Sequence, residues 1–176
     1  MRALVVYESM YGNTHTVAER IGEGLGPEVD VQVLPVEQAT AGVVAEADLV
    51  IVGGPTHAHG LTSSMTRKAA IDDANKPDSE LELDPDAEGP ALRSWFHGLA
   101  RAGNTPAAAF DTRFDASPVF TGRASKGIGR RLRHHGIDVL VEPESFLIDK
   151  DNHLLDGEAD RARDWGEAVG RRLITA

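Results

Sequence analysis

Three short runs of consecutive apolar residues constrain the fold of this chain most. They lie at residues 3–7, 49–52 and 107–110, and each gives way to polar residues or glycine. A strand that is apolar at every position, rather than at alternate positions, is covered on both faces, as in a parallel sheet. Segments with helical spacing of apolar residues separate the runs. The sequence therefore predicts an α/β fold.

Two further strands complete the predicted sheet. Val29, Val31 and Val33 alternate with polar residues, which is typical of a half-exposed edge strand. Residues 139–141 and 146–148 form a last strand that is interrupted around Pro143. We predict a three-layer, doubly wound, five-stranded parallel sheet with the strand order 2-1-3-4-5.

Length and composition exclude several classes of protein. With 176 residues we expect a single domain covering residues 1–176. The net charge of −10 argues against nucleic acid and anionic membranes as partners. Cysteine is absent, which rules out disulfides and thiolate chemistry, and no apolar stretch approaches the roughly 20 residues of a membrane span. We expect a cytoplasmic protein without membrane insertion.

One segment departs from the α/β pattern. Residues 75–89 are acidic, contain Pro77 and Pro85, and are poor in apolar side chains. Such a segment can bury little surface. We expect an exposed insert that is mobile and dispensable for folding.

The first strand leads directly into a turn rich in small polar groups. Ser9 and Thr14 supply hydroxyls, Asn13 an amide, and Gly12 permits a tight turn before a helix. The N-terminus of a helix attracts a phosphate through its free N–H groups and its dipole. No lysine or arginine lies within residues 9–14, so this loop predicts a phosphate held by neutral donors. The alternative is an ordinary helix start capped by Asn13 or Thr14.

At this point the chain resembles the flavodoxin family over essentially its whole length. The most specific part is Ser9-Met10-Tyr11-Gly12-Asn13-Thr14, which is similar to the family's FMN-phosphate loop. Tyr11, with the preceding Ser9 and Met10, is more similar to the flavodoxin-like quinone reductases, and Gly54-Pro55-Thr56 resembles the second flavin loop of that branch. The resemblance implies one non-covalently bound FMN.

The resemblance also implies two loops on either side of the flavin ring. The first loop consists of Pro55, Thr56, His57, Ala58, His59 and Gly60. The second begins with Asp111, Thr112, Arg113 and Phe114 and continues to residue 118. The sequence leaves open which of the two histidines faces the ring, and whether they form half of a metal site. Arg113 is the one cation expected near the ring, unless it pairs with Asp111.

Three functions are compatible with these features. The first is an electron-transfer flavodoxin that shuttles electrons between redox protein partners, favoured by the acidity and by the lack of an evident nicotinamide-phosphate site. The second is an FMN-dependent NAD(P)H:quinone oxidoreductase, favoured by Tyr11. The third is a flavin-free relative that binds a protein partner, which the phosphate loop disfavours. We predict the first.

Overall fold

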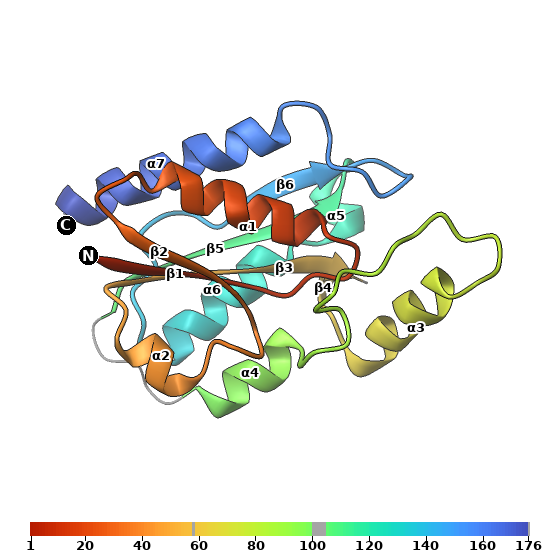
Figure 1. Cartoon of the computed structure of the whole chain (residues 1–176), viewed down its shortest axis with the longest axis horizontal. Coiled ribbons are helices and arrows are strands. Elements are labelled where there is room, and N and C mark those ends of the chain that lie inside the picture. The colour runs from red at the N-terminus through yellow and green to blue at the C-terminus, as the bar shows by residue number, and fades with distance from the viewer. Residues whose placement is uncertain (58, 100–104, 176) are drawn as a thin grey trace.

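Five parallel strands form the centre of the molecule in a computed structural model that describes residues 1–57, 59–99 and 105–175 (Figure 1). The strands are β1 (Arg2–Tyr7), β2 (Asp30–Pro35), β3 (Leu49–His57), β5 (Ala107–Phe114) and β6 (Glu144–Ile148). They lie in the order β2-β1-β3-β5-β6, which confirms the predicted topology. The sequence did not predict β4 (Gly60–Leu61), a short strand that pairs antiparallel with β3.

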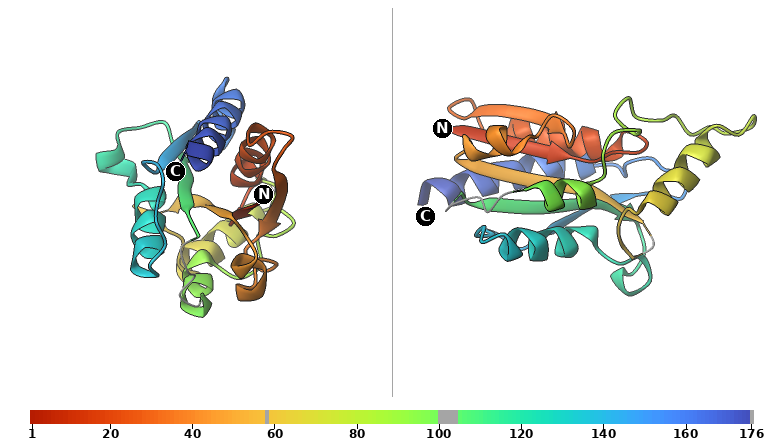
Figure 2. Two further views of the ribbon diagram at one scale, coloured as in Figure 1. Left: turned by 90° about the vertical axis from the view of Figure 1, so that its left-hand side faces the viewer. Right: turned by 90° about the horizontal axis from the view of Figure 1, so that it is seen from below.

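Helices cover both faces of the sheet (Figure 2). One face carries α1 (Asn13–Gly24) and α7 (Glu158–Thr175), and the other carries α2 (Ala41–Ala45), α4 (Leu92–Gly98) and α6 (Ala124–His134). Two helices, α3 (Ser64–Ala74) and the short α5 (Pro118–Thr121), lie toward the carboxyl ends of the strands. Among the described helices, none combines the length and the apolarity that crossing a bilayer requires.

The two-sided cover explains why β1 is apolar at every position from Ala3 to Tyr7. Ala3, Val5 and Tyr7 pack under α1 and α7, whereas Leu4 and Val6 pack on the opposite side of the sheet. All five side chains are at most 2% exposed. An alternating pattern would have placed polar groups in one of these two cores.

Glycines let α1 and α7 approach each other closely. A Cβ atom added to Gly24 would lie 1.9 Å from the carbonyl oxygen of Arg163, and one added to Gly166 would lie 2.2 Å from that of Ile21. Both positions therefore exclude any larger side chain. The contact fixes the position of α1, whose N-terminus lies at the carboxyl edge of the sheet (Figure 1).

Several predicted element boundaries were wrong. The strands continue past the apolar runs, so that β3 ends at His57 and β5 at Phe114, with Pro55 paired to Thr112. Backbone pairing extends them although their side chains become polar. The last strand is interrupted around Pro143 as predicted: Val139 makes a single parallel bridge to Ala107, and β6 begins at Glu144.

The acidic segment at 75–89 is only partly the exposed insert predicted from the sequence. Residues 75–78 are exposed, but Asp84 and Ala87 are buried. The Asp84 carboxylate lies 3.2 Å from Nδ1 of His15, and the Tyr7 hydroxyl donates to Asp86 over 2.8 Å. Polar anchors, which composition does not reveal, therefore hold the second half of the segment against the domain.

Candidate functional site

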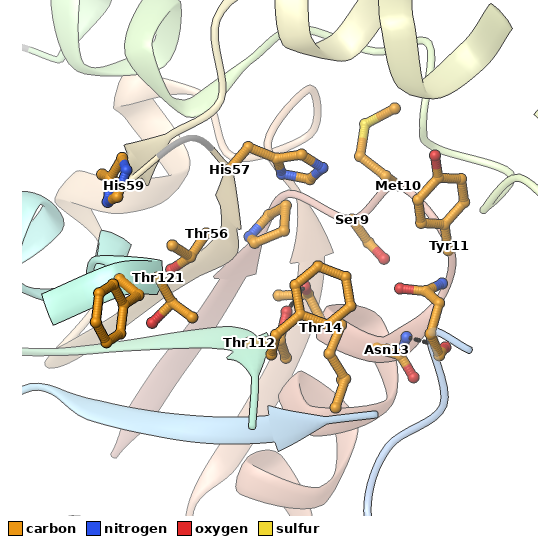
Figure 3. A pocket seen from close by; sticks show the side chains of 15 residues that line it. Ser9, Met10, Tyr11, Asn13, Thr14, Thr56, His57, His59, Thr112 and Thr121 are labelled. Carbon is orange, nitrogen blue, oxygen red and sulfur yellow. Dashed lines mark hydrogen bonds between the residues drawn. The ribbon is translucent and has the colours of Figure 1, made fainter. Parts of the chain in front are cut away.

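A pocket of about 300 Å³ opens at the carboxyl edge of the sheet (Figure 3). Three chain segments that are far apart in sequence meet around it: the β1–α1 loop, the end of β3 and the end of β5 with the turn that follows. Its lining consists of Ser9, Met10, Tyr11, Asn13, Thr14, Pro55, Thr56, His57, His59, Thr112, Phe114, Phe120, Thr121, Ile148 and Asn152.

Most of the residues predicted for the flavin site lie in this lining, but some do not. Gly12, Gly60, Asp111 and Arg113 are not part of the pocket wall. Ala58 lies outside the described residues. The sequence did not predict Thr121, Ile148 and Asn152 as site residues, because no local pattern places these positions beside the pocket.

The β1–α1 loop presents an open helix N-terminus to the pocket. Gly12 occupies the N-cap position with φ of 88°, and no side chain caps the helix. The Ser9 hydroxyl accepts a hydrogen bond from the Gly12 N–H over 3.1 Å. The alternative reading, a helix capped by Asn13 or Thr14, is therefore wrong. The first N–H groups of α1 remain available to an anion.

Two side chains in the first turn of α1 form hydrogen bonds with other segments that line the pocket. The hydroxyls of Thr14 and Thr112 lie 2.8 Å apart, which joins α1 to β5. The Asn13 amide donates to the carbonyl of Asn152 over 2.8 Å, which joins α1 to the loop after β6. The pocket floor is thus cross-linked by neutral polar groups.

Asp111 does not line the pocket, but its side chain forms hydrogen bonds with residues beside it. Its buried carboxylate accepts hydrogen bonds from the Ser125 N–H over 2.7 Å and from the Thr56 hydroxyl over 3.1 Å. The Thr56 hydroxyl in turn accepts from the Ala124 N–H over 2.9 Å. Burial raises the pKa of Asp111 despite these donors. Asp111 therefore anchors the N-terminus of α6 and does not contact the space of the pocket.

Arg113 does not take either of the positions that the sequence suggested. Its guanidinium donates to the carbonyl oxygens of Ala116 over 2.7 Å and Phe114 over 3.1 Å, so it folds back onto its own loop. It forms no ion pair with Asp111. Among the described residues, those that line the pocket include no lysine or arginine.

Apolar side chains surround the mouth of the pocket. Phe114 and Phe120 line it and are 48% and 76% exposed, and the neighbouring Val119 is 81% exposed. Large exposed apolar side chains gathered at a pocket are typical of a surface that meets a ligand or another protein.

The two histidines occupy different places. His57 projects from the end of β3 toward Met10, whereas His59 lies at the other side of the pocket near Thr121 (Figure 3). Burial lowers the pKa of His57. Within the described ranges, the group of three side chains that could together ligate a metal is His15, Asp84 and Asp86, and it includes neither His57 nor His59. Among the described residues, no third ligand therefore accompanies His57 and His59 to complete the metal site that the sequence left open.

The sequence did not predict the buried ion pair between Glu8 and Arg67. Glu8 accepts hydrogen bonds from Arg67 over 2.6 Å, from the Leu92 N–H over 2.9 Å and from the Thr62 hydroxyl. Arg67 also donates to the carbonyl of Ala87 over 2.6 Å. The pair therefore connects β1, α3, α4 and the acidic segment, and no local signal in the sequence could have joined residues so far apart.

Known proteins share this architecture. The family model described as flavodoxin matches residues 5–90. A flavodoxin from the domain Archaea superposes with a TM-score of 0.67 at 21% identity, covering 99% of both chains. A WrbA-like flavodoxin from Agrobacterium tumefaciens gives a TM-score of 0.61 at 19% identity, covering 99% of this chain and 98% of that one.

A larger protein contains the same fold as one part of its chain. Rubredoxin oxygen:oxidoreductase from Desulfovibrio gigas gives a TM-score of 0.64 at 16% identity, covering 99% of this chain but 36% of that one. No curated protein matches this chain. The chain is therefore similar to flavodoxins, through the family match over residues 5–90 and through its fold.

Proposed function

We propose that the protein binds FMN in this pocket and carries electrons between redox protein partners. The observation that carries the proposal is the uncapped N-terminus of α1, which points its free N–H groups at a pocket lined by Ser9, Asn13 and Thr14. A helix N-terminus with hydroxyl and amide side chains binds a phosphate without a cation. The apolar walls beside it suit a flat aromatic ring.

The residues present fit each part of FMN. The β1–α1 loop would hold the phosphate, and the ring would lie between the end of β3 and Phe114 of β5. When bound, FMN would supply the redox chemistry, while the chain binds and orients it. Exposed Phe114, Val119 and Phe120 at the mouth would leave one edge of the ring within reach of a partner protein.

The phosphate contacts can be tested by calorimetry. Replacing Ser9 and Thr14 together with alanine removes two hydrogen bonds to a charged group, each worth about 1.5–3 kcal/mol. We expect FMN affinity to fall at least tenfold, while riboflavin affinity falls much less. An unchanged FMN affinity would place the phosphate elsewhere.

The lack of a cation in the pocket wall favours a carrier over an NAD(P)H:quinone oxidoreductase. A nicotinamide dinucleotide carries phosphates that bind best to arginine or lysine, and Arg113 is committed to its own loop. With FMN bound, we expect NAD(P)H to be oxidised far more slowly than the roughly 10 per second of a typical enzyme, with benzoquinone as acceptor. A flavodoxin-type reductase should reduce the protein faster. Enzyme-like turnover with NAD(P)H alone would instead support the oxidoreductase, and failure to bind FMN would support a flavin-free partner-binding protein.

A further inference from the structure

His57 lines the pocket and is close enough to the buried Glu8–Arg67 pair for both charges to act on its ring. Its side chain lines the pocket and is directed toward the β1–α1 loop (Figure 3). Among the described residues, no group forms a hydrogen bond with its buried Nδ1 atom. A buried polar atom without a partner is uncommon, and on a side chain that lines a pocket it calls for a functional explanation.

Burial and the neighbouring charged groups act on the pKa of His57 in opposite directions. Burial is the largest influence and lowers its pKa, and Arg67 of α3 lowers it further. Glu8 at the end of β1 and the carbonyl of Pro55 in β3 act in the opposite direction. On the loop side, the Tyr11 hydroxyl is committed to the carbonyl of Ala70 over 3.0 Å. The ring is therefore disposed to accept a proton when a further negative charge enters the pocket.

We propose that His57 takes up a proton at Nδ1 when the flavin in this pocket is reduced. The inference rests on the proposed function, because it requires FMN in the pocket. Two electrons from a redox partner and one proton leave the reduced ring with a single negative charge. That charge raises the pKa of the nearby imidazole, so that a second proton from solvent binds Nδ1. The chain forms and breaks no covalent bond other than this N–H bond.

The two histidines of this loop, His57 and His59, have different roles. His57 is half-buried, and its buried Nδ1 atom has no hydrogen-bond partner among the described residues, whereas His59 is exposed to solvent. An exposed imidazole is shielded by water from a charge on the flavin. His57 is the member of the pair that senses the flavin.

The test is the reduction potential of the FMN-loaded protein between about pH 5 and pH 8, the range in which histidine titrates. A two-electron reduction that takes up two protons changes with pH twice as steeply as one that takes up a single proton. We expect the wild-type slope to double on the acid side of this range. His57→Gln should keep the shallow slope throughout, and His97→Gln, an exposed histidine of α4, should behave like the wild type.

A second readout follows the proton directly. NMR titration of the His57 ring should give a higher pKa in the reduced, FMN-loaded protein than in the oxidised, FMN-loaded protein. Equal slopes in wild type and His57→Gln, or an imidazole pKa that reduction leaves unchanged, would overturn the assignment of His57 while FMN binding stands. Failure of the wild-type protein to bind FMN would overturn both this inference and the proposed function.

Discussion

The backbone N–H of Asp84 donates a hydrogen bond to the carbonyl oxygen of Met10 over 2.8 Å. This bond joins the acidic segment to the loop that precedes α1. Met10 is 2% exposed and packs with Ala70 and Ala87, so the segment covers one side of the loop. An insert that looks unstructured by composition thus helps to shape the candidate phosphate site.

The two halves of the acidic segment should respond differently to mutation. Asp84→Ala removes the contact with His15 at 3.2 Å and the acceptor of the Asp86 N–H at 2.9 Å. We expect a loss of about 1–3 kcal/mol in the free energy of unfolding by urea. The matched change Asp78→Ala, at an exposed position, should stay within about 0.5 kcal/mol of wild type. A change within about 0.5 kcal/mol for both substitutions would show that these contacts contribute little to stability.

Two glycines, Gly12 and Gly136, allow the effect of backbone strain on stability to be measured separately from its effect on FMN binding. Gly12 and Gly136 both have positive φ, 88° and 79°, and both have open space where a Cβ atom would lie. Substitution by alanine should therefore destabilise the protein at either position by about 1–2 kcal/mol, through backbone strain alone. Only Gly12→Ala should also weaken FMN binding, measured by fluorescence titration. A similar loss of affinity in Gly136→Ala would mean that binding follows overall stability.

The buried carboxylate of Asp111 should give stability a specific pH dependence. Because burial raises its pKa in the folded state, the unfolded chain loses this proton first as the pH rises. Stability should therefore fall as the pH increases from the ordinary aspartate pKa of about 3.8 to the raised value, and then level off.

Asp111→Asn keeps an acceptor for the Ser125 N–H and removes the titration. Urea unfolding at a series of pH values should show that the difference between variant and wild type changes through this window, in favour of the variant at higher pH. A difference that is independent of pH would mean that Asp111 titrates alike in both states.

The sequence revealed the sheet because its signals are local. Continuous apolar runs and the glycine-containing turn at Gly12 depend on neighbouring residues, and they predicted the strand order and the loops that meet at the pocket. The ends of the strands were less predictable. Polar residues such as Thr56 and Thr112 remain within strands because their backbones are paired, whatever their side chains.

Long-range polar contacts could not be predicted. Arg67 looks like any helix-surface arginine, and only the fold brings it to Glu8. Arg113 lies at the predicted strand end, yet its guanidinium donates to carbonyl oxygens of its own loop and does not line the pocket. Asn152 reaches the first turn of α1 from the far end of the chain. Such contacts depend on the packed structure and leave no periodic pattern in the sequence.

The most direct test of the account compares FMN with riboflavin by calorimetry on the wild-type protein. If the N-terminus of α1 holds the phosphate, one FMN should bind per chain, and at least about tenfold more tightly than riboflavin, since even one hydrogen bond to the phosphate is worth about 1.5–3 kcal/mol. Equal affinities for the two compounds, or no binding of FMN, would contradict the account.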